Sequence, residues 1–159
     1  MPKSTADTVA PLLELPPTTL RPPRDTAQKP IGIGVIGYGY WGPKLVRNFS
    51  RAAGCDVTAI ADYNPEHLSR IGADYPDVLV STDYRALLDC GDIDAVAIAT
   101  PVASHFAIAR DALLAGKHVL VEKPLTTSVR EAEELVELAE RNNRLLAVDH
   151  TYLFTGAVE

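Results

Sequence analysis

The chain has 159 residues, of which 47% are hydrophobic and 23% charged, and its formal net charge is -6. This length fits one domain with a sizeable core, and the composition is ordinary for a globular protein. The negative charge argues against a general nucleic-acid binder, because affinity for a phosphate backbone comes largely from clustered Lys and Arg side chains.

The first thirty residues hold seven of the twelve prolines, and no hydrophobic period survives these interruptions. We expect residues 1–30 to form a disordered, Pro-rich leader. A polyproline II segment that binds a partner at LPPTTLRPP is the alternative. The longest apolar run here, VAPLL, is too short for a secretory signal, and no later stretch approaches a membrane span, so we expect a cytoplasmic protein without a membrane partner.

From Ile31 onward, short apolar segments alternate with amphipathic stretches, which is the pattern of βαβ units. Strands are expected at residues 31–36, 56–62, 78–81, 94–100, 118–122 and 145–149. Helices are expected at residues 43–53, 64–75, 82–90, 103–115 and 129–141. Six strands with intervening helices predict an α/β fold, a doubly wound parallel sheet of the Rossmann type with helices on both faces and its ligand at the carboxyl ends of the strands.

Local signals mark several helix ends. Asn64, followed by proline and glutamate, is typical of an N-cap, and Ser128 with glutamate three positions later matches a capping box. Either Thr82 or Asp83 can cap the helix that follows the third strand. Gly116 stands where a helix should end in the left-handed conformation.

Three glycines, Gly37, Gly39 and Gly42, form the pattern G-x-G-x-x-G between the first strand and the first helix. The first allows a tight turn, the second lets a pyrophosphate approach the backbone, and the third permits close packing of the helix. The pattern alone is weak, but its place between a strand and a helix is typical of dinucleotide binding. The intervening residues are candidate cofactor-binding residues as well: Tyr38, Tyr40 and Trp41.

Asp62 closes the second strand, 25 positions after Gly37. A carboxylate there can accept hydrogen bonds from the hydroxyls of the adenosine ribose and would repel a 2′-phosphate, so we expect NAD rather than NADP. The nearby Arg70 keeps NADP open. The alternative for Asp62 is a turn residue that caps the next helix.

The remaining motifs carry a resemblance to a known family. GYGYWG, the segment AIATPVASHFAIARDALLAGKHVLVEKP and VDHTYLF together resemble the N-terminal domain of the Gfo/Idh/MocA oxidoreductases, over residues 31–159. The resemblance implies that Lys123 contacts the substrate hydroxyl being oxidised and assists its deprotonation, and that Pro124 shapes the turn. Glu122, Lys123 and Pro124 are thereby all candidate cofactor-site residues. Without the resemblance, Lys123 could equally be a surface lysine at the edge of the sheet that has no catalytic role.

By the same resemblance, the segment after the fourth strand lines the cofactor cleft, with Thr100, Pro101 and His105 near the nicotinamide half. A structural histidine at a helix start is an equally open interpretation of His105. No histidine stands at metal-ligand spacing from a carboxylate, so we expect no metal. Cys55 and Cys90 lack metal spacing and are too few for a disulfide framework, so we expect both to be reduced.

Members of the family continue from HTYLF into a large α+β domain that supplies a second catalytic residue, most substrate contacts and usually the oligomer interface. We therefore expect residues 31–150 to form the dinucleotide-binding domain and residues 151–159 to begin the connection to a substrate domain that the chain lacks. The resemblance implies an NAD-dependent dehydrogenase of a sugar, cyclitol or nucleotide-linked sugar, whose present chain binds cofactor with little or no turnover.

Two other functions are open. A complete, non-catalytic NAD-binding module that acts with a partner chain is the main alternative. A methyltransferase that uses S-adenosylmethionine would share the glycine loop and the acidic residue after the second strand, but it gives no reason for the Glu-Lys-Pro element.

Overall fold

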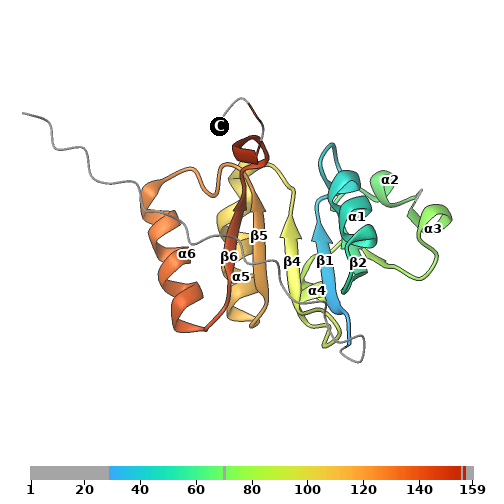
Figure 1. The fold of residues 1–159 in the computed structure, drawn as a ribbon, viewed down its shortest axis with the longest axis horizontal. Helices are drawn as coiled ribbons and strands as arrows, with labels where there is room; N and C mark the ends of the chain where they lie inside the picture. Colours follow the sequence, from blue (N-terminus) through green and yellow to red (C-terminus); the bar gives the residue numbers. More distant parts are fainter. Residues whose placement is uncertain (1–28, 70, 155, 157–159) are drawn as a thin grey trace, which may run out of the picture.

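The fold is a single six-stranded sheet with helices on both faces (Figure 1). The computed structural model describes residues 29–69, 71–154 and 156. Residues 1–28 of the predicted leader and most residues after 154 lie outside the described ranges. The strands are β1 (Ile31–Ile36), β2 (Cys55–Ala61), β3 (Leu79–Ser81), β4 (Ala95–Ile98), β5 (His118–Glu122) and β6 (Leu146–Asp149).

The strand order is β3-β2-β1-β4-β5-β6, and every neighbouring pair is parallel. The chain therefore builds outward from β1 to β3, returns across the sheet to β4, and builds outward again to β6. The order reverses between β1 and β4, and in open parallel sheets ligands bind outside the carboxyl ends of the strands at such a point. The doubly wound parallel sheet predicted from the sequence is confirmed.

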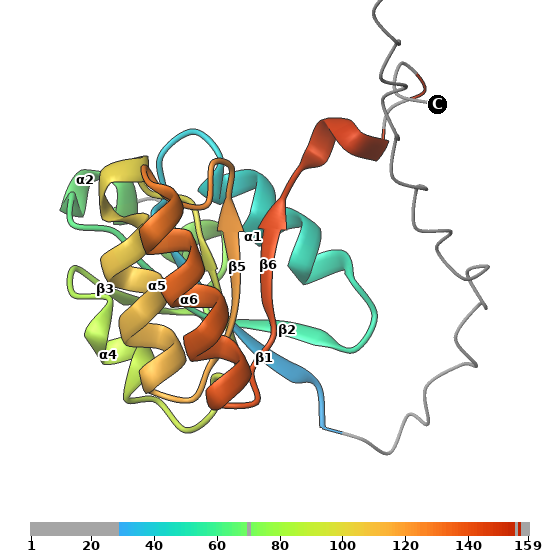
Figure 2. The same ribbon diagram turned by 90° about the vertical axis from the view of Figure 1, so that its left-hand side faces the viewer.

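The helices cover the two faces separately. They are α1 (Gly42–Arg51), α2 (Pro65–Leu68), α3 (Ile71–Asp74), α4 (Arg85–Leu88), α5 (His105–Leu114) and α6 (Val129–Arg141), with 3₁₀ turns η1 (Val102–Ser104) and η2 (Thr151–Phe154). Figure 2 shows α5 and α6 on one face of the sheet and α1 on the other. Within the described ranges, no helix combines the length and the apolarity that crossing a bilayer requires.

The core consists of two apolar clusters, one on each face of the sheet. Ile98 and Leu135 belong to the cluster under α4, α5 and α6, and both are fully buried. Val35, Val46 and Ile60 belong to the cluster under α1. Burial on both faces explains why the central strands read as nearly continuous runs of Ile, Val and Ala.

One predicted element is wrong. The single helix expected at residues 64–75 is two short helices, α2 and α3. Ser69, the C-cap of α2, donates its hydroxyl to the carbonyl oxygen of Glu66 at 2.8 Å. Such local side-chain bonds to the backbone compete with continuation of the helix.

The start predicted for the helix after β3 is also wrong, because the N-cap of α4 is Tyr84, which makes no side-chain cap bond, and not Thr82 or Asp83. Three other predicted helix ends are found. Asn64 accepts a hydrogen bond from the amide of Glu66 at 3.0 Å, and Ser128 accepts one from the amide of Glu131 at 3.3 Å. Gly116 has a φ of 74°, in the left-handed region where glycine is favoured. These caps fix where the amphipathic segments turn back toward the sheet.

Candidate functional site

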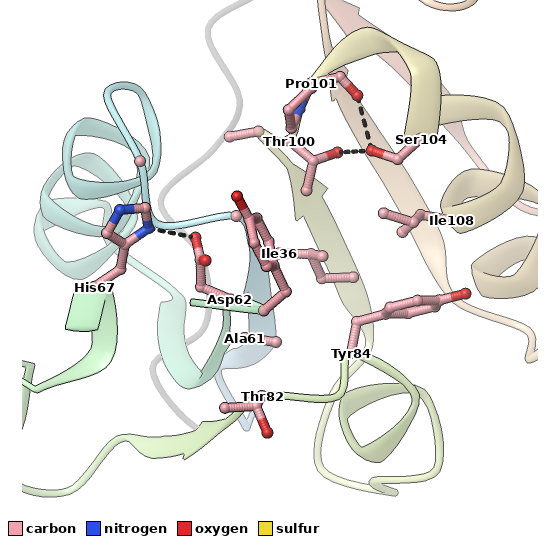
Figure 3. A pocket seen from close by; sticks show the side chains of 14 residues that line it. Ile36, Ala61, Asp62, His67, Thr82, Tyr84, Thr100, Pro101, Ser104 and Ile108 are labelled. Atoms are coloured by element: carbon pink, nitrogen blue, oxygen red, sulfur yellow. Dashed lines mark hydrogen bonds and ion pairs between the residues drawn. The ribbon is translucent and has the colours of Figure 1, made fainter. Parts of the chain in front are cut away.

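A cleft of about 350 Å³ opens at the carboxyl ends of β1, β2 and β4 (Figure 3). It lies at the point where the strand order reverses. Five of the predicted site residues line it: Gly37, Gly39, Asp62, Thr100 and Pro101. Nine further residues, none of them predicted as a site residue, complete the lining: Ile36, Ala61, Tyr63, His67, Thr82, Tyr84, Ala99, Ser104 and Ile108.

The three glycines of the fingerprint each stand in a different environment. Gly37 has a φ of 95°, and a Cβ there would lie 2.7 Å from the carbonyl carbon of Ala99. A Cβ on Gly42 would overlap the carbonyl oxygen of Gly37. A Cβ on Gly39 would meet nothing within 4 Å, so this position borders open space on the cleft. These environments fit the tight turn, the close helix packing and the open phosphate approach expected of the motif.

The amino end of α1 lacks a capping side chain. Its N-cap residue, Trp41, makes no side-chain cap bond, and the first turn contains no acidic residue. Lys44 stands in that turn instead, with Nζ 3.3 Å from the ring centroid of Tyr40 and 3.9 Å from that of Trp41. A cation is unfavourable near the positive end of the helix dipole, whereas an anion is stabilised there. This helix end is therefore suited to a negatively charged ligand.

Asp62 ties the glycine turn to the end of β2. Its Oδ2 accepts a hydrogen bond from the amide of Tyr38 at 2.6 Å and lies 3.1 Å from Nδ1 of His67, and its Oδ1 accepts one from the amide of Asn64 at 2.8 Å. Burial alone would raise the pKa of this carboxyl, but the bonds from Asn64, Tyr38 and His67 outweigh it and hold the pKa below its usual value. Asp62 is thus an ionised group facing the cleft. It also forms a turn with Asn64, as the alternative interpretation expected, but the N-cap of the next helix is Asn64 and not Asp62.

The loop after β4 forms the opposite wall of the cleft. The hydroxyl of Ser104 lies 2.8 Å from both Thr100 Oγ1 and the carbonyl oxygen of Pro101. His105, only 1% exposed, lies behind this wall and does not line the cleft. Its Nε2 is 2.8 Å from the carbonyl oxygen of Thr100, and its Nδ1 is 2.9 Å from that of Pro124. These are contacts to the backbone, and a contact of His105 with a cofactor stays a prediction.

The Glu-Lys-Pro element lies at the end of β5, outside the lining of this cleft. Lys123 and Pro124 are exposed, whereas Glu122 is 6% exposed and its Oε1 has no hydrogen-bond partner among the described residues. Burial raises the pKa of Glu122, and the neighbouring carboxyl of Asp149, which shares a hydrogen bond with it, raises it further. Because Glu122 and Asp149 are register partners in β5 and β6, this carboxyl pair is fixed by the sheet.

His67 is the most informative lining residue that the sequence analysis included only as part of the helix expected at residues 64–75. It stands five positions after Asp62, in the helix that the Asn64 cap begins. This spacing places the first turn of the helix beside the end of the preceding strand, so the closeness of His67 to Asp62 could have been inferred from the sequence. Thr82 and Tyr84 follow β3 and carry no comparable signal. In the part of the chain that the structure describes, no group of three or more His, Cys, Asp or Glu side chains could hold a metal ion.

These features define a class of protein. A doubly wound parallel sheet, a glycine turn leading into an uncapped helix, and a carboxylate at the end of β2 are the marks of a dinucleotide-binding Rossmann domain. A family model agrees: Gfo/Idh/MocA, described as an oxidoreductase family with an NAD-binding Rossmann fold, matches residues 31–150. The chain belongs to the Gfo/Idh/MocA oxidoreductase family.

Two of the similar proteins have names that refer to glycosides or nucleotide-linked sugars. The chain is 40% identical over 123 residues to a glycosyl hydrolase family 109 protein of Shewanella sp. (strain ANA-3), covering 72% of this chain and 27% of that protein. It is 35% identical over 122 residues to a UDP-N-acetylglucosamine 3-dehydrogenase of Acidithiobacillus ferrooxidans, covering 74% of this chain and 36% of that protein. The chain thus spans about a third of the length of these relatives.

A solved structure shows the same fold with a cofactor. A 3-ketoreductase from Actinomadura kijaniata, in complex with TDP-benzene and NADP, superposes with a TM-score of 0.75 and 33% sequence identity, covering 81% of this chain and 41% of that one. The family description names NAD and this structure holds NADP, so the comparisons identify an NAD(P)-binding fold without separating the two cofactors.

Proposed function

We propose that residues 31–150 bind NAD(H), in preference to NADP(H), in the cleft at the carboxyl ends of β1, β2 and β4. The main support for the proposal is that two features border the same cleft, namely the start of α1 and the carboxyl of Asp62. The amino end of α1 is open to an anion, and the ionised carboxyl of Asp62 lies beside the glycine turn at 2.6 Å from the Tyr38 amide. In this class of fold, the pyrophosphate of a dinucleotide lies at the start of the first helix and its adenosine ribose lies at the acidic residue that ends the second strand.

The residues fit this cofactor. The open space at Gly39 leaves room for the pyrophosphate against the backbone, and the amides at the start of α1 would donate to its oxygens. Asp62 would accept from a hydroxyl of the adenosine ribose, and its negative charge would repel a 2′-phosphate. Thr100 and Pro101 would line the path toward the nicotinamide half. Arg70, which kept NADP open, lies outside the described residues.

Hydride transfer would be the chemistry that the bound nicotinamide supplies. Lys123 is our candidate for proton transfer. The resemblance of the Glu-Lys-Pro element to the family motif supports this role, and the lysine is exposed at the carboxyl end of β5. Its Nζ would accept the proton of the alcohol in oxidation, or return it in reduction. The names of the relatives support a sugar or a nucleotide-linked sugar as the substrate class, and the resemblance to the family implies a cyclitol as well.

We propose further that this chain alone binds the cofactor with little or no turnover. Hydride transfer needs the substrate held in near-attack geometry against the nicotinamide, and a loss of positioning groups removes much of the rate enhancement. The matched segment makes up 27% and 36% of these two relatives, so both have chain beyond the region matched here. The alternative is a non-catalytic NAD-binding module that completes a site with a partner chain.

Titration of the purified chain with NADH tests the proposal, followed by the enhancement and blue shift of nicotinamide fluorescence, with NADPH titrated in parallel. We expect saturable binding of NADH and weaker binding of NADPH. A folded chain that binds neither would contradict the proposed function, and tighter binding of NADPH would contradict the role given to Asp62. Addition of candidate partner chains, with turnover as the readout, separates the module alternative from the dehydrogenase.

A further inference from the structure

His67 and Asp62 form a pair on the wall of the cleft. The carboxyl oxygen Oδ2 of Asp62 lies 3.1 Å from Nδ1 of His67, and both residues line the cleft (Figure 3). The Asp62 side chain is 5% exposed and the His67 side chain 40% exposed. The carboxyl of Asp62 is therefore buried in the wall of the cleft, and the imidazole of His67 is more accessible to a bound ligand.

Asp62 has little acceptor capacity left for a ligand. A carboxylate offers about four lone-pair sites, two on each oxygen. The Tyr38 amide and His67 occupy Oδ2, and the Asn64 amide occupies one site on Oδ1. One site on Oδ1 remains. The diol of an adenosine ribose carries two hydroxyl donors, so Asp62 alone can satisfy one of them.

The second ring nitrogen of His67, Nε2, is suited to bind the remaining ribose hydroxyl. With Nδ1 donating to Asp62, Nε2 of a neutral ring carries a lone pair and accepts a hydrogen bond, whereas Nε2 of a protonated ring donates one. No hydrogen bond from Nε2 is found among the described residues. Among the ion pairs of the described residues, Asp62 is the partner of His67.

We propose that His67 reads the substituent on the 2′ carbon of the adenosine ribose and thereby sets the preference between NAD and NADP. The inference rests on the proposed function of the cleft. The neutral ring accepts a hydrogen bond from the 2′-hydroxyl of NAD. The protonated ring donates to the 2′-phosphate of NADP and offsets part of the repulsion from Asp62. The preference for NAD over NADP is therefore smaller when the ring is protonated than when it is neutral.

The test is a comparison of the wild-type chain with His67→Gln, in which the amide can still bond Asp62 but carries no charge. The dissociation constants for NADH and NADPH are measured by nicotinamide fluorescence at about pH 8 and about pH 6. A 2′-phosphate itself titrates near pH 6, but that contribution is the same in both proteins and cancels. His118→Gln is the matched control, since His118 lies at the amino end of β5, at the edge of the sheet opposite the cleft.

We expect the ratio of the NADPH to the NADH dissociation constant to fall about tenfold more in the wild type than in His67→Gln between these pH values, as one charge-assisted hydrogen bond would give. His118→Gln should follow the wild type. Equal pH dependence in the wild type and His67→Gln overturns the inference and leaves dinucleotide binding intact. A folded wild-type chain that binds neither cofactor at either pH refutes the proposed function, and the inference with it.

Discussion

Substitution at Gly39 should separate cofactor binding from folding. A Cβ there meets no atom within 4 Å, and Gly39 is not among the residues with positive φ, so valine fits the backbone. We expect Gly39→Val to change the free energy of unfolding by no more than about 0.5 kcal/mol. The valine would occupy the space of the pyrophosphate. Loss of roughly two amide hydrogen bonds to a charged group, at about 1.5 to 3 kcal/mol each, weakens NADH binding by about 10² to 10⁴-fold.

Gly42→Ala is the matched comparison. Its Cβ would overlap the carbonyl oxygen of Gly37, so the helix must shift, and we expect a loss of about 1 to 3 kcal/mol in stability. The assays are NADH titration by fluorescence and unfolding by denaturant, followed by circular dichroism. If folded Gly39→Val bound NADH as tightly as the wild type, the phosphates could not lie against this residue and the assignment of the cleft would be refuted.

Three further predictions concern single side chains. Lys123→Ala should leave NADH affinity within about twofold of the wild type, because the lysine lies outside the cleft lining; a loss as large as that of Gly39→Val would contradict the separation of roles. Asp62→Asn should destabilise the chain by about 2 kcal/mol at neutral pH, since an amide cannot accept from all three donors. Folding lowers the pKa of Asp62, so its contribution to the free energy of unfolding is present above the ordinary carboxyl pKa and is lost as the pH falls through the lowered pKa. Denaturant unfolding at several pH values should therefore show the stabilities of Asp62→Asn and the wild type converging in acid. The pKa of Glu122 is raised by burial, so the stability due to its protonated form is complete below the ordinary carboxyl pKa and is lost as the pH rises through the raised one. Glu122→Gln should therefore gain thermal stability relative to the wild type as the pH rises, and a constant difference across pH would show that Glu122 does not titrate in the folded chain.

Much of the fold could be predicted because its signals are local. The bounds of β1 and β5 match the expected segments, and the caps at Asn64 and Ser128 are where the sequence indicates them. Each signal depends on residues within a few positions of one another. The split between α2 and α3 was missed because residue propensities do not show whether Ser69 bonds its hydroxyl to the backbone, a bond that competes with continuation of the helix.

The site was predicted in part for the same reason. Gly37, Gly39 and Asp62 follow from a motif with fixed spacing, and they meet at the cleft. The pairing of Glu122 with Asp149 depends on the register of β5 and β6, whose strands are joined through a whole helix, so no short-range pattern reveals it. Burial of Glu122 is a consequence of that register and of the helices around it.

The imidazole of His105 joins two loops that are distant in sequence. It contacts the carbonyl oxygen of Thr100 on one side and that of Pro124 on the other, from a fully buried position. The wall of the cleft and the segment that carries Lys123 are therefore connected through one buried side chain. We expect a ligand that shifts Thr100 to shift the loop of Lys123 as well, because His105 contacts both. Under the proposed function, this contact would link the binding of the dinucleotide to the position of the lysine.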